Sequence, residues 1–179
     1  MKPDLKFDFS VDEENHKVLV QREFAAPVSE VWAAWTQQEL LDQWWAPAPW
    51  KTETESMEFK EGGQWTYSML GPNGERHYSK ANYGPIVEKE SFSTLDSFCD
   101  EKGKVDPDLP RSEWKVEFKD KGETTLVTVE IQHESSKDMK QNLEMGFREG
   151  FTMALGNLDK LLEKTNSDSE KGQASTQQE

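Results

Sequence analysis

The chain has 179 residues, 34% of them hydrophobic and 11% aromatic, and its 21 basic and 35 acidic residues give a formal net charge of −14. This length suits one domain with a sizeable core, and the seven tryptophans and nine phenylalanines argue against a disordered chain. A mean hydropathy of −0.91 without a long apolar run excludes a membrane-spanning helix, and the negative charge disfavours nucleic acid as a partner.

The first predicted elements are strands followed by two short helices. Phe7 and Phe9 alternate as in a short edge strand, within a segment 1–16 that we expect to be only partly ordered. Apolar alternation over residues 17–24 predicts the first full strand. Pro27 opens a helix whose apolar residues recur at helical spacing, and the capping-box pattern of residues 36–39 predicts the start of a second helix.

A run of strands follows, each recognised by alternating apolar residues or by flanking turn residues. The Asn-Gly pair at positions 73–74 is typical of a hairpin turn. For the strand over residues 91–99 the sequence does not decide which face points inward, because Phe92 and Phe98 on one face compete with Leu95 on the other. The predicted strands cover residues 52–59, 65–69, 77–87, 91–99, 112–119 and 124–133.

The last predicted element is one long helix from Lys137 to Lys164, with an apolar stripe of spacing three and four. The polar residues 165–179 lack bulky apolar side chains, so we expect a disordered tail after a domain that spans 17–164. Strands with helices on one face indicate an α+β protein built on an antiparallel sheet.

Six short motifs recur in a characteristic order and spacing along the chain, and they are Arg22–Trp32, Trp44–Pro47, Gly62–Trp65, Gly71–Gly74, Gly122–Thr124 and Gly146–Phe151. Together they resemble the START-like superfamily, also called SRPBCC, with the Bet v-type helix-grip fold. Within it the chain is similar to the activator of heat-shock protein 90 ATPase homologue family. The resemblance implies a curved antiparallel sheet wrapped around the long C-terminal helix, with a cavity between them.

No catalytic or metal-binding pattern stands out in the sequence. His16, His77 and His133 lie far apart, without metal-ligand spacing, and there is no nucleophile elbow or phosphate-binding loop. We therefore expect no enzyme activity, no metal and no cofactor. The single cysteine, Cys99, cannot form an internal disulfide, and the first residues lack a secretory signal pattern, so we expect a cytoplasmic protein.

The aromatic residues carry the leading functional hypothesis, which is non-covalent binding of a small hydrophobic or amphipathic molecule in that cavity. Filling of an ordinary core is the alternative for each of them. The candidate ligand-binding residues on the strands are Trp65, Tyr67, Met69, Tyr83 and Trp114. Of the adjacent Trp44 and Trp45, we expect one to anchor the short helices and the other, Trp45, to lie at the cavity mouth, whereas burial of both is the alternative.

The long helix carries further candidates beside its core stripe. Met145, Glu149 and Met153 share a face with Gly146 and Gly150, and glycine inside a helix is costly. Close packing against strands would explain the glycines, and so would space for a ligand. We expect Glu149 either to face the cavity and hold the polar end of a ligand, or to reach solvent.

A second hypothesis is a protein-interaction role with a chaperone as partner, as the family name implies, with acidic charge steering the association. About sixteen residues precede the first full strand, so we expect the additional N-terminal domain of the eukaryotic activators to be absent. An enzyme of the same superfamily is the third hypothesis. The sequence does not predict the ligand's identity or the oligomeric state.

Overall fold

The computed structural model describes the backbone of residues 5–176 and the side chains of residues 5–165. Its elements follow the predicted order closely. They are β1 (Phe7–Asp12), β2 (Lys17–Phe24), α1 (Val28–Thr36), α2 (Gln38–Trp44), β3 (Lys51–Met57), β4 (Gln64–Leu70), β5 (Arg76–Val87), β6 (Ser91–Cys99), β7 (Ser112–Asp120), β8 (Thr125–His133), α3 (Ser136–Glu144) and α4 (Phe147–Thr176).

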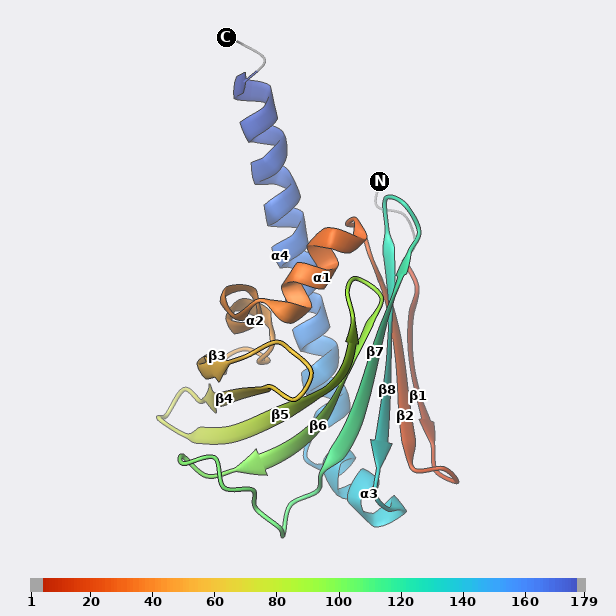
Figure 1. Ribbon diagram of the computed structural model, residues 1–179, viewed down its shortest axis with the longest axis vertical. Coiled ribbons are helices and arrows are strands. Elements are labelled where there is room, and N and C mark those ends of the chain that lie inside the picture. Colours follow the sequence, from red (N-terminus) through yellow and green to blue (C-terminus); the bar gives the residue numbers. More distant parts are fainter. Residues whose placement is uncertain (1–4, 177–179) are drawn as a thin grey trace.

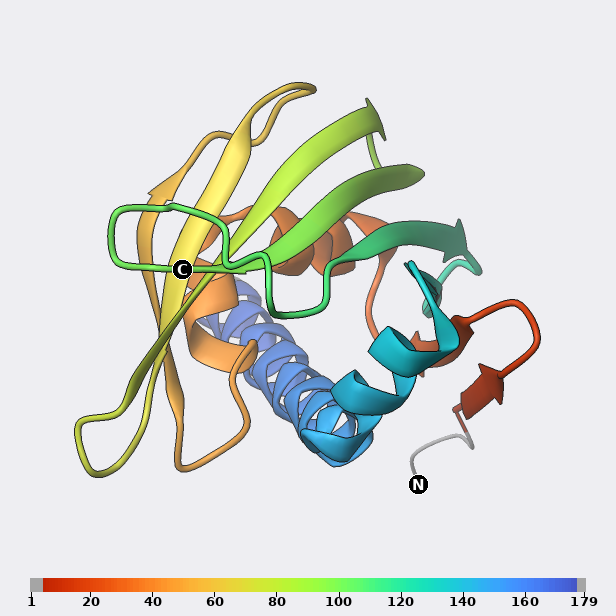
Figure 2. The same cartoon turned by 90° about the horizontal axis from the view of Figure 1, so that it is seen from below.

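All eight strands form one antiparallel sheet, in the order β1-β2-β8-β7-β6-β5-β4-β3. The sheet curls around α4, while α1 and α2 close the same concave side (Figures 1 and 2). α4 makes most of its close backbone contacts with α1, α2 and α3. The sheet therefore meets α4 mainly through side chains, and the predicted α+β helix-grip architecture is confirmed.

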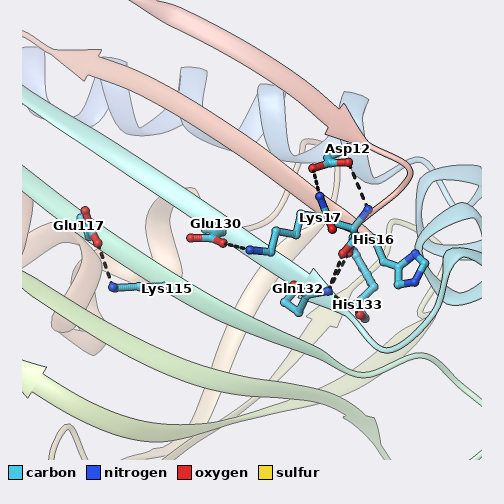
Figure 3. A network of polar contacts seen from close by, with 9 residues as sticks. Asp12, His16, Lys17, Lys115, Glu117, Glu130, Gln132 and His133 are labelled. Atoms are coloured by element: carbon cyan, nitrogen blue, oxygen red, sulfur yellow. Dashed lines mark hydrogen bonds and ion pairs between the residues drawn. The ribbon is translucent and has the colours of Figure 1, made fainter.

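The two faces of the sheet differ in polarity as strand alternation requires. In β8 every second residue is buried, from Thr125 to His133. The outward residues carry ion pairs such as Lys17–Glu130 at 2.8 Å, and the side-chain amide of Gln132 donates to the backbone carbonyl of Asn15 (Figure 3). The outer face is therefore a solvated surface, and the core lies on the concave side.

The core is largely aromatic, and its rings meet edge to face, an arrangement that the ring quadrupoles favour. Trp32 of α1 lies 5.0 Å from Phe118 of β7, measured between ring centroids. Trp35 lies 4.9 Å from Trp44 of α2, and the Trp44 indole N–H donates to the carbonyl of Ala34. Trp44 thus fastens α2 to α1 while remaining 1% exposed.

The structure corrects two local predictions. Residues 36–39 form no capping box, because the Thr36 hydroxyl donates to the carbonyl of Trp32 and Gln37 is the N-cap of α2 without a side-chain hydrogen bond. The single long helix is two helices, which are separated at Met145 and Gly146. Gly146 has φ +91°, a left-handed conformation that ends α3 as glycine commonly ends helices.

The polar segment 165–179 enters the last turns of α4, whose backbone is helical to Thr176. The side chains from residue 166 onward and all of residues 177–179 lie outside the described part of the chain. Disorder of this segment stays a prediction.

Candidate functional site

A cavity of about 250 Å³ lies between the concave face of the sheet and the start of α4. Its walls come from the segment after α2, from β4–β8 and from α3 and α4, and exposed Met145 places its rim at the break between α3 and α4. The lining is mostly apolar, with a few polar groups, which is the usual character of a ligand pocket. The apolar lining residues are Trp45, Pro47, Tyr67, Met69, Phe98, Pro110, Trp114, Met145, Phe147 and Phe151.

The aromatic wall is built from rings that contact each other. Trp114 of β7 lies 5.5 Å from Phe151 and 5.9 Å from Phe147, both on α4. Trp45 lies 5.8 Å from Trp114 and 6.2 Å from Phe151. Its indole N–H donates to the Tyr67 hydroxyl at 3.0 Å, so its orientation is fixed. These rings bridge the gap between helix and sheet and hold the cavity open beside them.

Asp96 is the acidic group of this cavity. On β6 it shares the inward face with Thr94, and the sheet register places it opposite Ala81 of β5 and Ser112 of β7. The Thr94 hydroxyl donates to its carboxylate at 2.6 Å. Loss of solvent nevertheless raises the pKa of Asp96 to about 7, because the apolar walls penalise its charged form more than this hydrogen bond favours it.

His133 on β8 pairs with Ser112 of β7, which in turn pairs with Asp96, so His133 lies level with Asp96 across the sheet. Its side chain is 2% exposed, and neither ring nitrogen has a hydrogen-bond partner among the described residues. Burial lowers the pKa of His133, with Asp138 opposing that shift. The ring is therefore held neutral near pH 7. Asp96, Ser112 and His133 form a polar row across β6, β7 and β8 in an otherwise apolar wall.

A second hollow, of about 490 Å³, lies on the outer face of the sheet. It is more open to solvent than the inner cavity and is bordered by charged side chains, among them Glu113, Lys115 and Glu130. Two of these already form ion pairs, Lys115 with Glu117 and Glu130 with Lys17 (Figure 3). We regard this hollow as solvated surface, and the inner cavity as the candidate site.

The structure brings together five of the residues predicted from the sequence. These five residues line the inner cavity, and they are Trp45, Tyr67, Met69, Trp114 and Met145. Their role in ligand binding stays a prediction. Trp44, by contrast, is buried between the short helices, so the two neighbouring tryptophans occupy different environments as expected.

The other four predicted residues lie elsewhere. Trp65 and Tyr83 border a crevice of only about 20 Å³ in the aromatic core, too small for a ligand. The prediction that Glu149 faces the cavity is wrong, because the turn at Gly146 directs Phe147 and Phe151 inward and leaves Glu149 exposed. Met153, four residues further along the same side of α4, is likewise 47% exposed.

Sequence reasoning missed the polar groups of the cavity. Asp96 lies on β6, whose inward face the sequence does not determine. The structure shows that Phe92 and Phe98 face inward together with Asp96, whereas Leu95 faces outward. The alternation of residues 124–133, continued by two residues beyond Ile131, would have placed His133 inward. His77, Ser79, Ser97, Ser112 and Asn142 complete the polar lining.

Within the described residues, no cluster of His, Cys, Asp or Glu side chains could hold a metal ion. None of the helices described is both long enough and apolar enough to span a membrane.

The curled antiparallel sheet, the two short helices after β2 and the long C-terminal helix define a START-like domain of the SRPBCC superfamily. The family described as activator of Hsp90 ATPase homolog 1-like protein matches residues 25–163. The chain belongs to this family.

Solved structures of bacterial proteins share the fold. Protein Ms6760 of Mycobacterium smegmatis is 30% identical, with 88% of this chain and 96% of that chain covered and a TM-score of 0.81. A protein of Arthrobacter aurescens is 29% identical, with 88% and 91% covered and a TM-score of 0.84. The AHSA1 protein of Silicibacter pomeroyi is 18% identical, with 83% of this chain and 99% of that chain covered and a TM-score of 0.67. A search of curated proteins finds no match.

Proposed function

We propose that the protein binds a small hydrophobic or amphipathic molecule non-covalently in the cavity between the sheet and α4, without converting it chemically. The observation that supports this proposal is the cavity itself, with its aromatic walls and its few polar groups. A protein that needed only a stable core would fill such a space with side chains, since interiors pack closely. A cytoplasmic location is part of the same proposal and is tested by cell fractionation.

Two glycines at the start of α4 support the same function. Gly146 and Gly150 both line the cavity, so the wall they form has no side chains. A Cβ atom at Gly150 would meet only the Pro47 ring, at 3.6 Å, which is an ordinary contact. Close packing therefore does not require glycine at position 150. Space for a ligand explains it better.

The test is a screen of the protein against apolar and amphipathic compounds by thermal shift and native mass spectrometry. The variant Gly150→Leu fills the cavity from the helix side, and we expect it to fold and to lose ligands that the unmodified protein binds. Gly156→Leu is the matched control, because Gly156 also lies within α4, does not line the cavity, and has nothing within 4 Å of an added Cβ. Equal binding by both variants would contradict the proposal.

Membership of the Hsp90-activator family favours a second candidate function, an interaction with a chaperone. The net charge of −14 would steer association with a basic surface. The experiment is the ATPase rate of Hsp90 with and without this protein, at low and at high salt. An unchanged rate, together with no co-purification, would exclude this role.

A further inference from the structure

The charges around the cavity are asymmetric. Of its lining residues, Asp96 alone carries a carboxyl group, and none is a lysine or an arginine. Its side chain forms no ion pair with any described residue, and its one hydrogen-bond partner is the neutral hydroxyl of Thr94. The basic side chains of the lining are the imidazoles of His77 and His133, and burial lowers the pKa of His133, so the carboxyl group of Asp96 is the main charge that the cavity offers to a ligand.

Aromatic rings surround the same space. Trp45, Tyr67 and Trp114 line the cavity together with Asp96, and the register of β6 and β7 places Trp114 opposite Thr94, two residues from Asp96 on the same face. The face of an aromatic ring carries partial negative charge and attracts cations, most strongly where water is displaced. A carboxylate beside several rings is the chemistry that recognises an organic ammonium group.

Removal of a carboxylate from water is costly unless a cation compensates it. A protonated amine in the cavity would supply that compensation, and its carbon skeleton would bury against the apolar walls. A fatty acid or an organic phosphate would instead bring a second negative charge next to Asp96, with no lysine or arginine on the cavity wall to balance it and with burial opposing protonation of His133.

We propose that the cavity selects a small organic ammonium ion, an amine on an aromatic or aliphatic skeleton, whose nitrogen pairs with Asp96 beside the rings of Trp45 and Trp114. This inference rests on the proposed ligand-binding function and adds the chemical class of the ligand. It uses groups from β6, from β7 and from the segment that follows α2, which the fold brings to one place.

The test compares three probes of similar size and shape: 2-phenylethylamine, 2-phenylethanol and 3-phenylpropanoate. Each is titrated at about pH 8, where Asp96 is ionised and the amine is protonated, and binding is followed by tryptophan fluorescence and calorimetry. We expect the amine to bind at least about tenfold more tightly than the alcohol, and the acid to bind weakest.

Two matched variants separate the cavity from the general negative charge of the protein. Asp96→Asn removes the cavity carboxylate, and we expect it to reduce the preference for amine over alcohol to less than about threefold. Glu149→Gln removes one exposed carboxylate, does not touch the cavity, and should leave that preference unchanged. Titrations at 0.15 M and 0.5 M salt add a control, since attraction by distant surface charges is screened.

The outcomes distinguish this inference from the function on which it rests. Equal binding of alcohol and amine, or tighter binding of the acid, would overturn the selection of a cation while leaving a ligand-binding cavity. An Asp96→Asn variant that still prefers the amine over the alcohol would also overturn the selection of a cation by Asp96 and leave the ligand-binding cavity in place. If none of the three probes binds and the wider compound screen also finds no ligand, both the inference and the proposed function are wrong.

Discussion

At position 96, a carboxyl group in an apolar wall couples the stability of the fold to pH. Burial raises the pKa of Asp96 to about 7, above its value near 4 in an unfolded chain. Between about pH 4 and pH 7 the folded state therefore binds more protons than the unfolded state. The free energy of unfolding therefore falls as pH rises through this window. Above about pH 7 the loss of stability caused by the ionised Asp96 reaches its full size.

We predict that Asp96→Asn stabilises the protein by about 1–2 kcal/mol at pH 8 and has little effect at pH 4.5. The amide oxygen can still accept the hydrogen bond from Thr94, so the local geometry survives. The gain is smaller than the full pKa shift would give, because water reaches the half-buried side chain through the cavity. Urea denaturation at the two pH values measures it, and an equal gain at both would contradict the titration of Asp96.

His133 acts in the opposite direction on the same pH axis. Its pKa is lowered by burial, so the folded state resists protonation while the unfolded state does not, and stability falls as pH drops below about 6.5. The titration of His133 is common to the unmodified protein and Asp96→Asn. It therefore cancels in the difference between them, and the difference reports Asp96.

The neighbouring tryptophans at positions 44 and 45 should separate stability from binding. Trp44 is almost completely buried and hydrogen-bonded to Ala34, so Trp44→Ala should cost about 3–5 kcal/mol of stability. Trp45 is half-buried in the cavity wall, so Trp45→Ala should cost less stability and weaken ligand binding. Denaturation curves and titration with a bound compound measure the two effects. Equal loss of stability would refute this division.

Among the elements, the break between α3 and α4 has the largest consequence for the site. It turns the chain so that Phe147 and Phe151 enter the cavity wall while Glu149 faces solvent. A left-handed residue is needed at the break, and Gly146 supplies it with φ +91°. Gly150, four residues later, lies within the regular helix α4, where no positive φ is needed.

Alanine at these two glycines should therefore have opposite effects. Gly146→Ala is expected to destabilise the protein by about 1–2 kcal/mol, because a Cβ disfavours positive φ. Gly150→Ala should stabilise it by about 0.5–1 kcal/mol, because alanine is the better helix former and its Cβ fits beside Pro47. Thermal denaturation of both variants measures the contrast. Destabilisation by both would mean that position 150 needs glycine for packing.

The strands could be predicted from the sequence because alternation is a local signal. β4 and β7 are clear cases, with Trp65 and Tyr67, or Trp114 and Val116, on one face. Asp96 could not be assigned in this way, since β6 carries apolar residues on both faces and only the sheet register decides between them. The helix break was missed because the apolar spacing continues from Leu143 to Phe147 across Gly146, as if one helix were present.

On the scale of the whole molecule, the cavity results from the way the sheet and the short helices pack around α4. The sheet curls around α4 (Figure 2), but α1, α2 and α3 make most of the close backbone contacts with it. Large rings fill the space near α1 and α2, where Trp35 and Trp44 meet. Near the start of α4 the wall is formed partly by glycine, so the same space stays empty. Position along the helix therefore decides whether this space is core or cavity.

The extent of the folded domain provides the last prediction. Among the described side chains of α4, which end at residue 165, Leu162 is the last buried one, and residues 166–179 contain no bulky apolar side chain. Removal of residues 166–179 should therefore change the free energy of unfolding by less than about 0.5 kcal/mol. Urea denaturation compares the two proteins, and hydrogen exchange of the full chain reports whether the end of α4 is protected. A clear loss of stability on truncation, with slow exchange in residues 166–176, would show that this end of the helix belongs to the cooperative fold.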